Sequence, residues 1–255
     1  MSLRAALRLG VERANRRLVI GASCVIAGLT MFGGAATALR IRHVDRTSSA
    51  LLTLITWVLV WGTGVLLAFG LSSRALVRDH EEGIVDLFER HAFGRTTYIL
   101  ARTFGIACVL AAVLGGATLL SGTAIALMSF RPLESLRAVG ATLGAAAYVL
   151  LFSFTMAPLA LAALGGRGKA GGYVVLLFLL GIPEVIAKMT EGVLPASFHE
   201  LLSFGGALSA ARDSLLPHSL DIGRFLRATL VLALVAGMGV LFLHREVGRV
   251  REGES

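Results

Sequence analysis

The stretch "TFGIACVLAAVLGGATLLSGTAIALMSF", Thr103 to Phe130, contains no aspartate, glutamate, lysine or arginine along its whole length. A helix needs roughly 20 apolar residues to cross about 30 Å of hydrocarbon. A strand of a membrane barrel would instead alternate apolar and polar side chains over about ten residues, and this stretch has no such alternation. The sequence therefore predicts a membrane-spanning helix here.

Similar runs occur on both sides of this stretch. Hydrophobic residues make up 56% of the 255 and charged residues only 16%, whereas soluble domains carry about 25% charged residues. The pattern predicts an all-α, polytopic membrane protein formed by one transmembrane domain over residues 1–255. Its six predicted spans are residues 18–39, 47–73, 103–130, 138–166, 170–187 and 226–244. Five spans, with the fifth segment re-entrant, are the alternative.

The breaks between the spans follow from proline and from polar residues. Pro132 is expected to stop the third span, and Pro183 to kink or end the fifth, because proline lacks an amide donor and clashes one turn back. The residues between Pro183 and the sixth span predict short interfacial or re-entrant helices outside the membrane. Residues 1–17 mix leucines with five arginines, which favours an interfacial helix, and a basic tail is the alternative.

The basic residues flank the spans, which favours lipid headgroups over nucleic acid as their partner. With six spans and a cytoplasmic N-terminus, 15 of the 24 arginines and lysines fall on the cytoplasmic side. This bias predicts that both termini are cytoplasmic. We expect a multi-pass protein of the bacterial cytoplasmic (inner) membrane.

No motif for catalysis, metal or nucleotide is expected to work in this chain. "GRGKAG", Gly166 to Gly171, matches a dinucleotide fingerprint but lies between two spans instead of between a strand and a helix. His80 and His91 are eleven residues apart, about 16 Å along a helix, too far to bind one ion. Cys24 and Cys108 each lie inside an apolar run and lack the spacing of a redox or metal motif. We therefore expect no enzyme activity and no cofactor in this chain.

A charged segment, residues 78–97, interrupts the apolar pattern between the second and third spans. Ile84, Leu87 and Phe88 recur at helical spacing, with acids on the other faces and Arg90 near the end. The acids precede the arginine, an order that suits the helix dipole. Such a short helix is unstable alone in water. We expect its apolar face to be covered by the membrane surface or by a groove in another protein.

The same segment resembles the loop between spans two and three of ABC-2 type permeases of ABC exporters, whose pattern is R-E-x-G-T-L-E-x-L-L-x-x-P-V-S-R. The residues of this chain that correspond to the pattern in type and order are Glu82, Gly83, Asp86, Leu87, Phe88 and Arg95. Ala92 replaces the proline of the pattern and Ile84 its threonine. The resemblance covers the whole chain in architecture and about fifteen residues in motif.

In that family the loop is a coupling helix that docks into a separate ATPase subunit. The resemblance implies a partner-binding role for Glu82, Gly83, Asp86, Leu87, Phe88, Arg90 and Arg95. It also implies that ATP and Mg are bound on the partner, and that two ATPase subunits assemble with this chain and a second permease copy or paralogue.

Glu184 and Lys188 lie four residues apart just after the fifth segment. Charges near the membrane are functional suspects, so one interpretation is a gate or substrate contact. A surface ion pair at the headgroups, worth a few tenths of a kcal/mol, is the other.

Three function classes follow. A permease subunit of an ATP-driven exporter is the leading hypothesis. A membrane scaffold or assembly subunit is the second, and a secondary carrier or polytopic enzyme the third. A carrier is expected to carry charges within its spans or a paired repeat, and neither is visible here.

Overall fold

The computed structural model describes residues 47–90, 94–128, 132–166, 169–190, 201–215 and 221–251, together with Val19, Gly21, Val193 and Pro195. All the regular structure in these residues is helical. The elements are α3 (Thr47–Val58), η1 (Leu59–Gly64), α4 (Val65–Ser72), α5 (Ala75–Glu81), α6 (Ile84–Arg90), α7 (Arg95–Met128), α8 (Pro132–Leu164), α9 (Lys169–Leu176), η2 (Leu177–Gly181), α10 (Ile182–Met189), α12 (Phe204–Asp213) and α13 (Ile222–Arg251).

Five of the described helical stretches are long and apolar enough to cross a membrane. They are Leu54–Glu81, Arg95–Leu127, Ser135–Leu164, Gly171–Met189 and Ile222–Gly248. The fold is thus that of an all-helical, multi-pass membrane protein, as the sequence predicts. The predicted first span, residues 18–39, and the interfacial helix, residues 1–17, lie outside the described residues.

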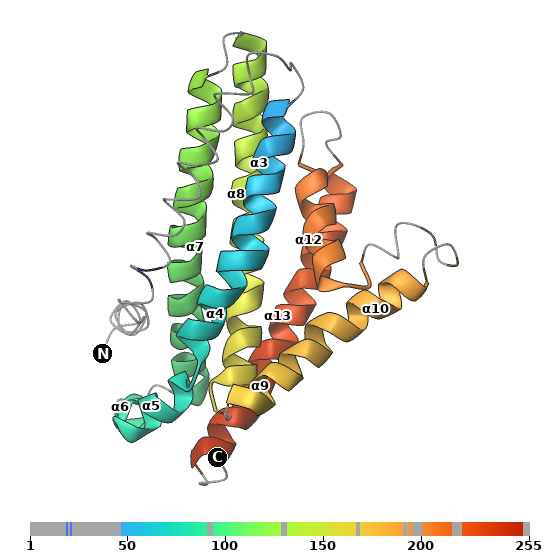
Figure 1. Cartoon of the computed structure of the whole chain (residues 1–255). Helices are drawn as coiled ribbons and strands as arrows, with labels where there is room; N and C mark the ends of the chain where they lie inside the picture. The colour runs from blue at the N-terminus through green and yellow to red at the C-terminus, as the bar shows by residue number, and fades with distance from the viewer. Residues whose placement is uncertain are drawn as a thin grey trace.

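Helix α8 occupies the centre of the bundle, with α7, α13 and the α3–η1–α4 helix packed around it (Figure 1). Its most apolar stretch is 78% buried, against 17% for the helix formed by α9, η2 and α10. The α9–η2–α10 helix starts beside the C-terminal end of α8. Its distance from the rest of the bundle increases from α9 to α10 (Figure 1). Large apolar side chains such as Leu66, Leu127 and Leu177 are at least 70% exposed. Such exposure is unfavourable in water and fits helices that face the apolar interior of a membrane.

Two predicted span boundaries differ from the structure. Helix α7 begins at Arg95 instead of Thr103 and contains Arg102, which pairs with Asp79 inside the protein. Pro132 begins α8 instead of ending the preceding helix. Proline is favoured at the first helical position because the amide it lacks would have no partner there.

Pro183 does not end the fifth helix, so of the two outcomes expected at this proline, a kink or an end, the end is wrong. The chain continues from α9 to Met189 as one helical stretch. The residues before Pro183, Leu177–Gly181, form the π-helix η2. A π-turn has a different hydrogen-bond register from the α-helix. Pro183, which lacks an amide donor, lies at the start of α10, just after this turn.

The connection before the last span is packed more deeply than the sequence predicts. Helix α12 lies against α8 and α13 and buries Phe204, Ala207, Leu208, Ala210 and Ala211. The Ser203 hydroxyl caps it by accepting a hydrogen bond from the Gly206 amide at 2.9 Å. The segment thus includes a helix built into one end of the bundle, not only helices lying outside it.

Close contacts at glycine occur where helices cross. A Cβ added at Gly122 on α7 would overlap the Thr142 side chain of α8, and one at Gly64 would lie 2.9 Å from Leu114 Cδ1. By contrast, the adjacent Gly115 and Gly116 on the same helix have nothing within 4 Å of an added Cβ. Which glycines lie at seams depends on helix rotation, which composition alone does not give.

Candidate functional site

The charged segment forms two short helices, α5 and α6, at the end of the bundle where α13 also ends (Figure 1). Two residues in left-handed conformation create its bends. Arg74 has φ 55° where α4 gives way to α5, and Gly83 has φ 69° between α5 and α6. Only glycine adopts this region without a steric cost, so the turn between α5 and α6 favours glycine at position 83.

Backbone hydrogen bonds hold the start of α5 to the end of α8. The Arg74 amide donates to the Leu164 carbonyl at 3.0 Å, and the Leu76 amide donates to the Gly165 carbonyl at 3.1 Å. Gly165 is tightly enclosed, since a Cβ there would lie 2.8 Å from Leu76 Cγ. These contacts attach the start of α5 to the C-terminal end of α8.

A buried polar cluster joins α5 to α7. Asp79 Oδ2 accepts a hydrogen bond from the Tyr98 hydroxyl at 2.8 Å and lies 3.0 Å from Arg102 Nε. Asp79 is 1% exposed, Tyr98 2% and Arg102 6%. Asp79 Oδ1 and Arg102 Nε make no aligned hydrogen bond within the described part of the chain, so the attraction between them is mainly ionic. A buried charge that loses such a partner is costly, which fixes α5 on α7.

The apolar face of α6 packs on the same chain. Ile84, Val85 and Phe88 are buried, and the Phe88 ring meets the Tyr98 ring edge-on at a centroid distance of 5.6 Å. This corrects the expectation that the membrane surface or another protein covers this face. Phe88, expected to touch a partner, instead packs against α7.

The outer face of the segment is charged, and it includes the exposed Arg78 on α5 as well as three acids. Glu81, Glu82 and Asp86 are exposed, so the structure places Glu82 and Asp86 on the surface beside the Gly83 turn. The side chains of Leu87 and Arg90 lie outside the described residues, although both positions belong to α6. Arg95, the first residue of α7, points toward α13, where its Nη1 lies 3.6 Å from a Cβ placed at Gly248.

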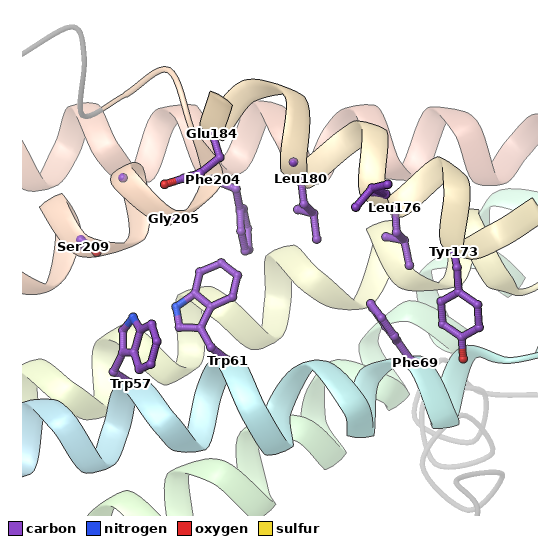
Figure 2. Close-up of a pocket in the computed structure, with 13 residues that line it drawn as sticks. Trp57, Trp61, Phe69, Tyr173, Leu176, Leu180, Glu184, Phe204, Gly205 and Ser209 are labelled. Carbon is purple, nitrogen blue, oxygen red and sulfur yellow. The ribbon is translucent and has the colours of Figure 1, made fainter. Parts of the chain in front are cut away.

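The structure separates Glu184 from Lys188. Glu184 lines a cavity of about 720 Å³ between the α3–η1–α4 helix and the α9–η2–α10 helix, whereas Lys188 is exposed and not among the lining residues. No ion pair joins these two described side chains, so the predicted surface pair is absent. Figure 2 shows the aromatic side chains around this cavity.

Several residues of these sites are missed by sequence reasoning. Tyr98 and Arg102 lie one helical turn apart and so share a face of α7, but their partner Asp79 is distant along the chain. Trp57 and Trp61, four residues apart, both line the cavity and look in sequence like ordinary lipid-facing aromatics. Asp79 and Arg102 are both buried, which the sequence does not indicate because it does not show that these two residues lie beside each other.

Among the residues that the structure describes, no group of three or more histidine, cysteine, aspartate or glutamate side chains could hold a metal ion. Comparison of the chain with models of protein families, with curated proteins and with solved structures gave no match.

Proposed function

We propose that this chain is the permease subunit of an ATP-driven exporter of the ABC-2 type, with α5 and α6 as the docking element for a separate ATPase subunit. The observation that carries the proposal is the construction of this element. Its inner face is fixed to α7 and α8 by buried contacts, while Glu81, Glu82 and Asp86 face outward. A rigidly held, charged surface can transmit a push from a partner to the spans behind it.

The distribution of charge favours a cytoplasmic position for this element. Nine described arginine and lysine positions lie near this end of the bundle: Arg74, Arg78, Arg90, Arg95, Arg102, Lys169, Arg245, Arg249 and Arg251. Five lie near the other end: Arg137, Lys188, Arg212, Arg224 and Arg227. Cytoplasmic ends of spans are enriched in basic residues, so both α6 and the end of α13 face the cytoplasm in our proposal, in a bacterial inner membrane.

The proposal assigns ATP and Mg to the partner. Two ATPase subunits and a second permease copy or paralogue complete the transporter, with the transport route between the permeases. ATP binding on the partner moves its surface, and the α5–α6 element passes that motion to α7 through Asp79, Tyr98 and Arg102 and to α8 through Arg74.

Reversing the charge of the outer face tests the docking role. We expect the double substitution Glu82→Lys and Asp86→Lys to lower recovery of the ATPase subunit with the affinity-tagged chain by about tenfold or more, because like charges across an interface cost several kcal/mol. The measurement is co-purification from native membranes, with the ATPase subunit identified by mass spectrometry through its G-x-x-x-x-G-K-[ST] sequence.

The control reverses two exposed charges at the other end of the bundle, Arg137→Glu and Lys188→Glu. This variant is expected to recover the ATPase subunit as the wild type does. Equal recovery with the Glu82/Asp86 variant would contradict a docking role for this face.

A further inference from the structure

The cavity around Glu184 lies between two helices that diverge and is closed at one end by α12 (Figure 2). Trp57, Trp61 and Phe69 come from the α3–η1–α4 helix, Tyr173 comes from the facing α9, and Phe204 comes from α12. Its volume of about 720 Å³ is within the range of about 300–1,000 Å³ that is typical of small-molecule sites. Its size and lining suit a bulky apolar molecule.

Both π-helices of the described chain contribute to this cavity. η1 supplies Trp61 to one wall, and η2 supplies Leu177, Leu180 and Gly181 to the other. π-turns are rare and often occur at functional sites, because they turn side chains out of the regular helical register. Two of them on facing walls indicate that the walls are shaped for a purpose beyond spanning the membrane.

One side of Gly205 faces both a carboxylate and an aromatic ring. The position that a Cβ would take at Gly205 lies 3.3 Å from Glu184 Oε2 and 3.4 Å from Trp61 Cζ2. The absence of a side chain at Gly205 leaves its Cα exposed on this side. A ligand group that packs against this Cα lies beside both the Glu184 carboxylate and the Trp61 indole.

The carboxylate of Glu184 has no basic partner among the described side chains. Lys188 is exposed and does not line the cavity. Arg212, the one basic residue of α12, forms an ion pair with Asp213 at 2.8 Å and stands 5.7 Å from the Tyr148 ring centroid. Tyr148 in turn accepts a hydrogen bond from Trp61 Nε1 at 3.1 Å. Arg212 is thus held behind the aromatic wall. A negative charge beside apolar surface favours a positively charged ligand.

We propose that this cavity binds a hydrophobic organic cation. The positive group packs against Gly205, beside the carboxylate of Glu184 and the indole of Trp61, where the carboxylate supplies the ion pair. The apolar body lies along the wall formed by Phe69 and Tyr173. The identification of a hydrophobic cation as the transported substrate rests on the permease function proposed above. The binding site itself does not depend on that function.

The two tryptophans of the chain, Trp57 and Trp61, both line the cavity, so the intrinsic fluorescence reports on it directly. The experiment titrates the full-length chain in lipid nanodiscs, without any ATPase subunit, with tetraphenylphosphonium. Its anionic counterpart of the same shape, tetraphenylborate, serves as the charge control. We expect saturable quenching by the cation, with about tenfold weaker apparent affinity in Glu184→Gln, because a charge-assisted contact is lost.

Two further variants sharpen the result. Gly205→Ala places a methyl group between the ligand and the Glu184 carboxylate and is expected to weaken binding as Glu184→Gln does. Lys188→Gln is expected to bind as the wild type. Equal affinity in the wild type and Glu184→Gln, or preference for tetraphenylborate in both, would overturn the proposal and leave the cavity as a lipid-filled groove. The binding assay needs no ATPase, so it is independent of the co-purification experiment. If the cation binds but no ATPase subunit co-purifies with the chain, the permease function alone is refuted. If an ATPase subunit co-purifies but the cation does not bind, the cation site alone is refuted.

Discussion

Replacing Arg102 with alanine is expected to lower the free energy of unfolding by about 3–5 kcal/mol, because it leaves the buried Asp79 carboxylate without its counter-charge. Both side chains are almost fully buried, and their contact joins α5 to α7. The measurement is equilibrium unfolding of the purified chain in detergent micelles. The matched control is Arg137→Ala, which removes an exposed arginine from α8 and is expected to change stability by less than about 0.5 kcal/mol.

A variant in which both charged side chains of the Asp79–Arg102 pair are replaced by neutral ones separates the cost of an unpaired buried charge from the cost of lost packing. The double substitution Asp79→Asn and Arg102→Gln is expected to regain part of the stability lost in Arg102→Ala, since neither side chain then leaves an unpaired charge buried. If Arg102→Ala unfolds like Arg137→Ala, the polar cluster does not hold α5 in place, and the proposed path from α5 to α7 loses its basis.

The second large effect is expected at Phe88. Phe88→Ala removes a ring that is 1% exposed and packs on Tyr98, a change that typically costs about 3–5 kcal/mol. Since α6 is only seven residues long, most of this loss should appear as local opening of the segment rather than as unfolding of the bundle.

Hydrogen exchange measured by mass spectrometry separates these outcomes. Peptides covering residues 84–90 should exchange faster in Phe88→Ala, while peptides from the centre of α8 keep their protection. Asp86→Ala, at an exposed position of the same helix, should leave exchange in this segment unchanged. Unaltered protection of residues 84–90 in Phe88→Ala would mean that α6 is held by contacts other than this ring.

The helical class and the existence of the spans follow from the sequence because a bilayer imposes a length and a composition on every helix that crosses it. The described helices overlap the predicted segments 47–73, 103–130, 138–166, 170–187 and 226–244, with their ends displaced by several residues. The displacement at Arg102 has a clear physical cause. A charged residue looks like the end of a span unless its counter-charge, Asp79, is known to lie beside it.

The candidate sites were less predictable. Periodicity identifies Ile84 and Phe88 as one face of a short helix, but not that this chain's own α7 covers that face. Glu184 was a suspect because of its position near the membrane. Its aromatic neighbours Trp61 and Phe204 come from distant parts of the chain, and only the packing of α12 against the bundle brings them together. The two π-turns leave no recognisable pattern in a sequence that is apolar throughout.

Photo-crosslinking from position 86 tests the central claim most directly. Benzoylphenylalanine is introduced in place of Asp86 in the intact membrane, with Leu127 at the other end of α7 as the control position. We predict that irradiation links position 86, and not position 127, to a polypeptide that carries the phosphate-binding sequence G-x-x-x-x-G-K-[ST]. The absence of any such adduct from position 86, or adducts there only with proteins of the opposite side of the membrane, would contradict the account.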